Sequence, residues 1–174
     1  LPSHRNCGYG NPVMTDALVK SLAYQLIKWA TEKGLTLATA ESCTGGLISA
    51  ALTDVPGASS VFTHGFVTYA NEAKRDILGI PQGMLDTHGA VSAPVAKAMA
   101  MGARTLAQAD LSVSVTGIAG PGGGSPDKPV GLVYIAVATH KEISLHRHIY
   151  PQGGREYIRL LTVRAALRHL WGRI

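Results

Sequence analysis

The chain has 174 residues, of which 46% are hydrophobic and 16% are charged. This composition argues against intrinsic disorder, and the length suits a single domain with its own core. The formal net charge is +5, and its excess lies near the C-terminus, at Arg155, Arg159, Arg164, Arg168 and Arg173. No run of Lys and Arg with interleaved aromatic residues occurs, so we expect a solvated or oligomer-facing helix there rather than a nucleic-acid surface.

The two cysteines, Cys7 and Cys43, have neither CxxC nor zinc-ligand spacing, so we expect no metal and a reducing, cytoplasmic compartment. No apolar stretch is long enough to cross a bilayer, and the first residues contain no signal-peptide core. Because Met14 begins a better-formed segment, we interpret residues 1–13 as a disordered or artificial leader. Residues 14–174 are predicted to form one domain.

Hydrophobic periodicity and turn residues predict the secondary structure in chain order. The first half is predicted to contain a helix at 15–33, a buried strand at 35–40 and a helix of small residues at 44–53. A strand at 62–69 and a short helix at 71–78 follow. The second half begins with a predicted loop at 81–89, a long helix at 92–108 and a buried strand at 111–115. A glycine-rich loop at 117–129 follows, then two paired strands at 130–139 and 143–150, and a last helix at 154–171. This order predicts an α/β fold, a three-layer α/β/α sandwich with a mixed, mostly parallel sheet.

The motif ESCTGG, residues 41–46, connects the first predicted strand to the next helix. Free N–H groups at a helix start stabilise a phosphate or an oxyanion, so Ser42 is the favoured nucleophile. Cys43 is the rival nucleophile, although its side chain could equally point into the core. The simplest alternative is that Ser42 or Thr44 only caps the helix. Gly45 and Gly46 would let a substrate approach the backbone closely.

A serine hydroxyl becomes reactive when a neighbouring group takes its proton. His64 and His88 are candidates for a histidine base, and Lys74 for a lysine base, because a lysine shielded from water loses its proton more readily. By pattern alone, Lys74 is better explained as a solvated charge that pairs with Asp76 or Asp110.

Three hydroxyl-bearing residues follow or end predicted strands, namely Ser42, Tyr69 and Thr116. Ligand sites in α/β sheets gather beyond the carboxyl ends of strands, so we expect these residues at one edge of the sheet.

The segment SVTGIAGPGGG, residues 114–124, is too rich in glycine to be only a connection. Backbone N–H groups in such loops hold phosphates or carboxylates, and Gly117, Gly120 and Gly122 are the expected contact points. Arg155 starts the last helix beside two glycines, which suits a guanidinium directed at an anion. These features indicate a binding pocket for a phosphorylated small molecule.

Four blocks of sequence carry a resemblance to a known family. They are TLATAESCTGGLISAALTDVPGAS, GFVTYANEAKRDILGI, HGAVSAPVAKAMAMGA, and SVTGIAGPGGG followed by KPVGLVYIAVA. In this order they resemble the CinA C-terminal domain family, and the resemblance runs from about Thr15 to Arg168. The chain is similar to a standalone version of the domain, without the nucleotide-pyrophosphatase-like domain of full-length members.

The resemblance implies a nicotinamide-nucleotide amidase of pyridine nucleotide salvage. Such an enzyme hydrolyses nicotinamide mononucleotide (NMN) to nicotinic acid mononucleotide and ammonia, without metal or cofactor. The implied catalytic residues are the nucleophile Ser42, the base Lys74 with Tyr69 beside it, and the supporting hydroxyl of Thr116. The implied substrate-binding residues are Thr44, Gly45, Gly46, Gly117, Gly120, Gly122 and Arg155, with Arg159 one turn further along.

Two other functions stay open at this point. The chain could bind a nucleotide without turning it over, or it could be a partner protein in competence or DNA damage that uses its Arg-rich last helix. We expect no membrane partner and no nucleic acid. The helix at 93–107 is rich in Ala and Met, and we expect a homodimer or homotrimer that pairs through it.

Overall fold

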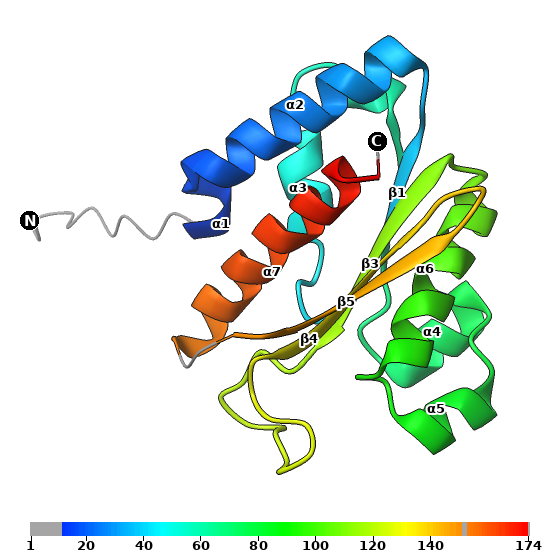
Figure 1. The fold of residues 1–174 in the computed structure, drawn as a ribbon, viewed down its shortest axis with the longest axis vertical. Helices are drawn as coiled ribbons and strands as arrows, with labels where there is room; N and C mark the ends of the chain where they lie inside the picture. Colours follow the sequence, from blue (N-terminus) through cyan, green and yellow to red (C-terminus); the bar gives the residue numbers. More distant parts are fainter. Residues whose placement is uncertain (1–11, 151–152, 174) are drawn as a thin grey trace, which may run out of the picture.

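The computed structural model describes residues 12–150 and 153–173, in which a five-stranded sheet lies between two layers of helices (Figure 1). The strands are β1 (Leu37–Glu41), β2 (Phe62–Val67), β3 (Leu111–Gly117), β4 (Leu132–Ala138) and β5 (Ile143–Ile149). The helices are α1 (Pro12–Thr15), α2 (Ala17–Lys33), α3 (Leu47–Thr53), the 3-10 helix η1 (Ala58–Ser60), α4 (Asn71–Leu78), α5 (Gln82–His88), α6 (Ala93–Ala107) and α7 (Gly154–Trp171). α4, α5 and α6 cover one face, and α1, α2, α3 and α7 cover the other, which confirms the predicted sandwich.

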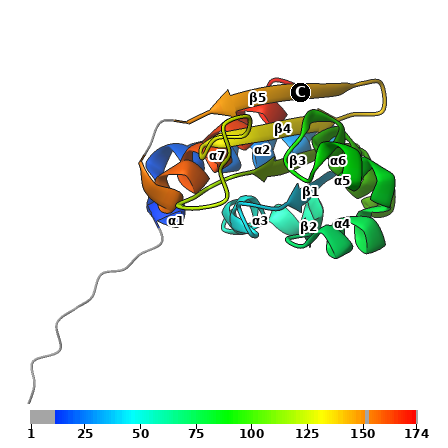
Figure 2. The same cartoon turned by 90° about the horizontal axis from the view of Figure 1, so that it is seen from below.

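The strand order is β2-β1-β3-β4-β5, and Figure 2 shows it from the β5 edge to the β2 edge. β1 pairs in parallel with both β2 and β3. β4 pairs antiparallel with β3 and with β5. The sheet is therefore mixed, and among the described strands β4 alone runs against the others.

The register decides which residues meet at the carboxyl edge of the sheet. Glu41, the last residue of β1, pairs with Val67 of β2 on one side and with Val115 of β3 on the other. Ser42 and Thr68 therefore leave the sheet as neighbours, at the edge where ligand sites of parallel sheets form.

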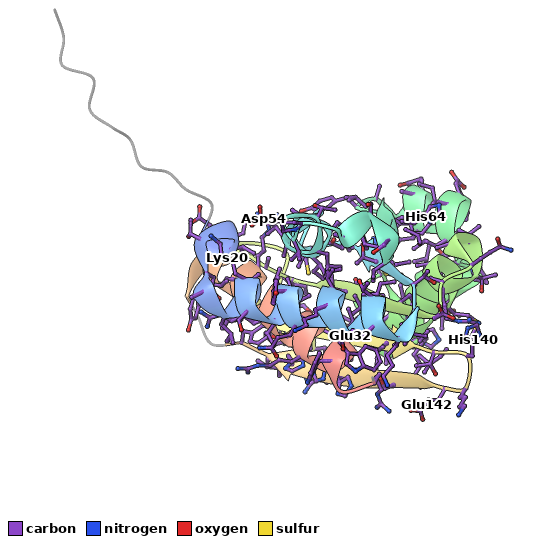
Figure 3. The ribbon with its side chains drawn as sticks, turned by 90° about the horizontal axis from the view of Figure 1, so that it is seen from above. Lys20, Glu32, Asp54, His64, His140 and Glu142 are labelled. Atoms are coloured by element: carbon purple, nitrogen blue, oxygen red, sulfur yellow. The ribbon has the colours of Figure 1, made fainter. Side chains whose placement is uncertain are left out.

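The layer formed by α2 and α7 packs branched side chains on the sheet. Leu26 of α2 and Leu167 of α7 are fully buried in the same core cluster. On the outer side of α2, Lys20 and Glu32 are exposed (Figure 3). This alternation is the helical periodicity that the sequence displays.

The opposite layer packs through small residues. α6 presents alanines to the sheet, so its backbone comes close to β3. The hydroxyls of Ser112 and Ser114 on β3 donate to the carbonyls of Ala100 and Ala96, each at 2.6 Å. These buried serines are thus satisfied by the helix that covers them.

Several boundaries differ from the predictions. α5 is a two-turn helix inside the predicted loop at 81–89, and α3 begins at Leu47 because residues 43–46 form a turn. Residues 1–11 of the expected leader lie outside the described residues. Val13, by contrast, lies in α1 and is 1% exposed within the core, so the folded domain extends beyond Met14 toward the N-terminus.

Candidate active site

Ser42 is placed by β1 and held by the neighbouring strand. Its backbone N–H donates to the carbonyl of Val115 at 3.0 Å, and its own carbonyl accepts from the N–H of Gly45 at 3.0 Å. Gly45 and Gly46 have φ angles of 59° and 97°, so the turn requires glycine-compatible backbone at both positions. The turn formed by residues 42–46, called the nucleophile turn below, therefore has a defined conformation before any ligand binds.

Glu41, and neither Ser42 nor Thr44, caps helix α3. Its fully buried carboxylate accepts from the N–H groups of Gly46, Ile48 and Ser49 at 3.0, 3.1 and 2.8 Å. The expected capping role of Ser42 or Thr44 is therefore wrong. An acid that precedes its helix by five or more residues has no capping-box spacing, which is why local pattern does not reveal it.

Lys74 meets Ser42 at this edge. Lys74 lies on α4, is 1% exposed, and its Nζ is 3.2 Å from Ser42 Oγ. Nζ also donates to the backbone carbonyls of Thr68 at 2.8 Å and of Tyr69 at 3.1 Å. Thr68 was not among the residues predicted from the sequence, because only the parallel register brings its carbonyl to this point.

Burial shifts Lys74 toward its neutral amine. Burial lowers the pKa of Lys74 below its ordinary value. A neutral amine has two N–H groups and one lone pair, and the two carbonyls occupy the two N–H groups. The lone pair is then left for the hydroxyl proton of Ser42, so the geometry suits Lys74 as a general base.

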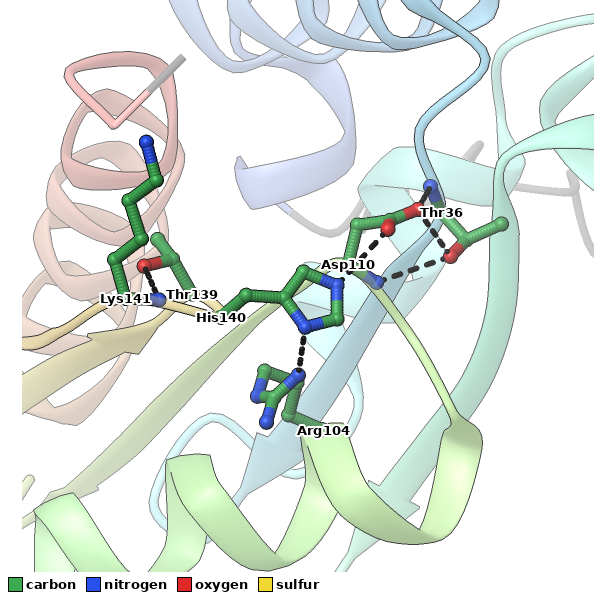
Figure 4. Close-up of polar contacts among 6 residues, drawn as sticks. All are labelled: Thr36, Arg104, Asp110, Thr139, His140 and Lys141. Atoms are coloured by element: carbon green, nitrogen blue, oxygen red, sulfur yellow. Dashed lines mark hydrogen bonds and ion pairs between the residues drawn. The ribbon is translucent and has the colours of Figure 1, made fainter.

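The alternative explanation of Lys74 as a solvated charge is wrong. Asp76 pairs with Arg75. Asp110 lies at the opposite edge of the sheet, where it accepts from Thr36 and from His140 (Figure 4).

The candidate histidine bases lie elsewhere. His64 is exposed on the edge strand β2 and stacks on Phe66 (Figure 3). His88 is exposed at the end of α5, where its carbonyl accepts from Lys128 Nζ. Within residues 12–150 and 153–173, no histidine contacts Ser42, so the structure supports lysine and not histidine as the partner of the serine.

Cys43 belongs to the core and not to the reactive surface. It is 5% exposed and packs in the same apolar cluster as Ile48. Burial raises the pKa of its thiol to about 12, so the thiolate needed for nucleophilic attack does not form near neutral pH. The burial of Cys43 is therefore a physical reason to prefer Ser42 as the nucleophile.

Near Ser42 and Lys74, Arg155 of α7 connects two other segments of the chain, at Tyr69 and at Gly120. Its Nη2 donates to the phenol oxygen of Tyr69 at 2.9 Å, and its Nη1 donates to the carbonyl of Gly120 at 3.0 Å. Tyr69 thus contacts Lys74 through its backbone carbonyl and contacts Arg155 through its phenol. The phenol has no contact with Lys74 that would let it relay a proton.

Arg159 reaches the site separately. Its Nη2 donates to the carbonyl of Thr44 in the nucleophile turn at 2.9 Å. Neither Arg155 nor Arg159 forms an ion pair with a carboxylate in the described part of the chain. Arg164 is directed elsewhere, into an ion pair with Asp16. The guanidinium of Arg155, which is exposed and which no carboxylate neutralises, favours an anionic ligand at the edge of the sheet.

Several predicted residues have structural roles that the sequence did not show. The hydroxyl of Thr116 is buried and donates to the carbonyl of Ala90 at 2.8 Å, and no contact joins it to Ser42 or Lys74. A Cβ on Gly117 would lie 2.8 Å from the carbonyl oxygen of Leu132, so this glycine permits close strand pairing.

The remaining predicted contact residues differ in exposure. The hydroxyl of Thr44 is buried without a hydrogen-bond partner. Gly120 has a φ of 77° and holds Arg155, which suits a role in the site. Gly122 is exposed, with open space around it.

The described residues contain no group of three or more His, Cys, Asp or Glu side chains that could hold a metal ion. None of the described helices has the length and apolarity to cross a bilayer.

Comparisons with known proteins agree on one family. The family model for the CinA C-terminal domain matches residues 19–174. A CinA-like protein from Geobacter metallireducens is 55% identical over 143 residues, which are 82% of this chain and 34% of that protein. A CinA-like protein from Geobacter sulfurreducens is 56% identical over 82% of this chain and 34% of its own length. The chain thus spans about a third of the length of the curated relatives it matches.

Solved structures show the same fold. The competence/damage inducible protein CihA from Agrobacterium tumefaciens is 49% identical, with a TM-score of 0.89 over 90% of this chain and 96% of that chain. A competence-damaged protein (CinA) superfamily protein from Escherichia coli is 35% identical, with a TM-score of 0.86 over 90% of each chain.

Proposed function

Because this chain belongs to the CinA C-terminal domain family, we propose that it is a cytoplasmic amidase that hydrolyses NMN to nicotinic acid mononucleotide and ammonia. The observation that carries the proposal is the 3.2 Å contact between Ser42 Oγ and Lys74 Nζ, made by a lysine that is 1% exposed. A buried lysine with no carboxylate partner is costly unless it works as a neutral base, and a serine beside it is the group it can activate.

The first half of the reaction forms an acyl-enzyme. Ser42 Oγ attacks the carboxamide carbon, and its proton passes to Lys74 Nζ. The backbone N–H groups of Cys43 and Thr44, which donate to no backbone carbonyl of the described residues, stabilise the oxyanion. The C–N bond then breaks, and Lys74 gives its proton to the leaving nitrogen, which departs as ammonia.

The second half releases the acid. A water molecule attacks the ester carbon of the acyl-enzyme, and Lys74 takes the proton of that water. The C–O bond to Ser42 breaks, and the proton returns from Lys74 to Ser42 Oγ. Throughout the cycle, the carbonyls of Thr68 and Tyr69 keep Nζ directed at the serine in both protonation states.

The 5′-phosphate of the nucleotide supplies the anion that the site favours. Arg155 uses two of its N–H groups on Gly120 and Tyr69 and keeps the others for a ligand. The phenol of Tyr69 accepts from Arg155, so its own proton is free to be donated. The exposed Arg155 and the glycine-rich loop therefore form the proposed phosphate site.

Ammonia release from NMN tests this proposal. Ser42→Ala and Lys74→Ala should each lower the rate by about 10³-fold or more, because the nucleophile and its base act as a unit. Ser60→Ala and Lys97→Ala change exposed residues of the same types and should leave the rate unchanged.

Two results would contradict the proposal. Wild-type turnover in both Ser42→Ala and Lys74→Ala would exclude the mechanism. A wild-type protein that binds NMN in calorimetry but releases no ammonia would be a nucleotide-binding module instead.

A further inference from the structure

Arg159 lies one helical turn after Arg155 on α7, yet it contacts a different part of the site. Its Nη2 donates to the carbonyl of Thr44, two residues after the proposed nucleophile Ser42. We propose that Arg159 is a positioning residue, which holds the nucleophile turn so that the N–H groups of Cys43 and Thr44 face the developing oxyanion. The inference rests on Ser42 being the nucleophile, and it does not depend on which amide is hydrolysed.

Hydrogen bonds hold the nucleophile turn at both ends and at the peptide that joins Thr44 to Gly45. At one end the N–H of Ser42 is held by Val115, and at the other end the N–H of Gly46 is held by the buried carboxylate of Glu41. Between them, the peptide that joins Thr44 to Gly45 donates its N–H to the carbonyl of Ser42 at 3.0 Å, and its carbonyl accepts from the N–H of Leu47 at 3.3 Å. The 2.9 Å hydrogen bond from Arg159 is therefore the shorter of the two that this carbonyl accepts.

A hydrogen bond at this peptide matters because the two residues after it are glycines, whose backbone permits other conformations. Gly45 and Gly46 both have positive φ angles, and glycine populates alternative conformations at little cost. If the turn were released at the peptide between Thr44 and Gly45, the whole turn would shift, and the N–H groups of Cys43 and Thr44 would lose their orientation toward the nucleophile. An oxyanion hole stabilises a transition state only when its donors are oriented in advance.

Arg159 is poorly placed to bind the substrate phosphate itself. Its Nε is buried and has no hydrogen-bond partner, so a ligand does not reach that atom. Its Nη2 donates to the carbonyl of Thr44 and lies 3.6 Å from the position of a Cβ on Gly45. Arg155, by contrast, is exposed. The two arginines are thus expected to affect different steps, Arg155 acting on substrate binding and Arg159 acting on the chemical step.

The charge of Arg159 also acts on the turn. Burial raises the pKa of Cys43 to about 12, and the charge of Glu41 raises it as well, whereas the smaller effects of the Arg159 and Arg155 charges lower it. The guanidinium groups are therefore close enough to the turn to favour negative charge there, which is the sign of charge that an oxyanion develops.

A neutral dialkyl fluorophosphonate separates positioning from phosphate binding, because it carries no anion for either arginine to bind. Ser42 Oγ forms a bond to phosphorus, the P–F bond breaks, fluoride leaves, and the serine proton passes to Lys74. The second-order rate of labelling at Ser42, followed by intact mass and peptide mapping, measures how well the site stabilises the transition state. The same variants are assayed for kcat and KM with NMN.

Arg159→Met should slow labelling and lower kcat by about 10- to 100-fold, with KM nearly unchanged and thermal unfolding like that of the wild type. Arg168→Met, which removes an exposed arginine of the same helix, is the matched control and should label at the wild-type rate. If Arg159→Met does not unfold cooperatively, Arg159→Gln, whose shorter side chain falls short of Thr44, takes its place.

Labelling of the folded Arg159 variant at the wild-type rate would overturn the inference, and so would an effect confined to KM. If the wild type is labelled at Ser42 but releases no ammonia from NMN, the proposed function fails, and the labelling rates still decide the role of Arg159. If the wild type is not labelled at Ser42 at all, the inference fails with the nucleophile on which it rests.

Discussion

Lys74 places an ionisable amine where water does not reach, with two backbone carbonyls and one serine hydroxyl around it. Burial lowers its pKa, so a larger fraction of the neutral amine is present near physiological pH than for a surface lysine. The carbonyl dipoles of Thr68 and Tyr69 limit this effect because they also stabilise the ammonium. The balance suits a base that must both take and return a proton.

The pH dependence of the reaction should follow Lys74. Activity in the form kcat/KM should rise with pH through the lowered pKa of Lys74, because only the neutral amine accepts the proton of Ser42. Lys74→Arg keeps the positive charge but loses activity at every pH, since arginine does not deprotonate. Initial rates between pH 5 and 10 measure both effects, and a flat profile for the wild type would contradict the assignment.

At the scale of elements, α7 connects the two arginines of the site with a histidine cluster at its other end. His169 of α7 stacks on His146 of β5 with ring centroids 3.5 Å apart, and its Nε2 lies 2.9 Å from Nε2 of His148. No carboxylate of the described residues pairs with these rings, whereas Arg173 lies near enough to disfavour their positive charge. The packing of the cluster therefore favours the neutral form of its rings.

Acid should weaken the packing of α7 on β5. Burial lowers the pKa of His146 and His148, and that of His169 to about 4, below the ordinary value of 6.5. The unfolded chain then binds more protons than the folded one, so this contribution to stability is complete above pH 6.5 and is lost as pH falls toward 4.

Urea unfolding at pH 8 and pH 5 measures this loss. His169→Phe keeps a stacked ring but removes one titrating group, so its free energy of unfolding should fall less between the two pH values than that of the wild type. His64→Phe, on the exposed face of β2, is the control and should behave like the wild type. An equal fall in His169→Phe and the wild type would exclude the cluster as the source.

At the scale of the whole molecule, the outer surface of α4 and α6 carries exposed apolar side chains. α4 and α6 expose Ile77, Met101 and Leu106, with exposed fractions of 46%, 52% and 52%, around a shallow cavity of ≈ 460 Å³. We propose that the expected homodimer or homotrimer forms through this surface, because adjacent exposed apolar side chains favour association. Since α4 also carries Lys74, association would stiffen the element that presents the base.

A charge placed in this surface should dissociate the oligomer. Met101→Glu would bury a carboxylate at the interface, so light scattering coupled to size exclusion should show a shift to the monomer mass. Lys97→Glu, an exposed change on the same helix outside the cavity, is the control. A wild-type protein that is already a monomer at micromolar concentration would contradict the proposal.

The sequence alone determined the order of the five strands and of the longer helices, the sandwich and the position of Ser42 at a strand end, but it missed α5. These follow from hydrophobic periodicity and turn residues, which are local properties of the chain. Local pattern also identified Lys74 and Arg155 as candidates, but it favoured a solvated charge for Lys74.

Only the tertiary structure decided which of these residues meet. Ser42 and Lys74 are 32 positions apart, Tyr69 and Arg155 are 86 apart, and Thr44 and Arg159 are 115 apart. Their contacts depend on the parallel register of β1 with its neighbours and on the packing of α4 and α7 against opposite faces of the sheet. No local pattern specifies such long-range geometry, so the cap supplied by Glu41, the neutral surroundings of Lys74 and the separate contacts of the two arginines appear only in the folded chain.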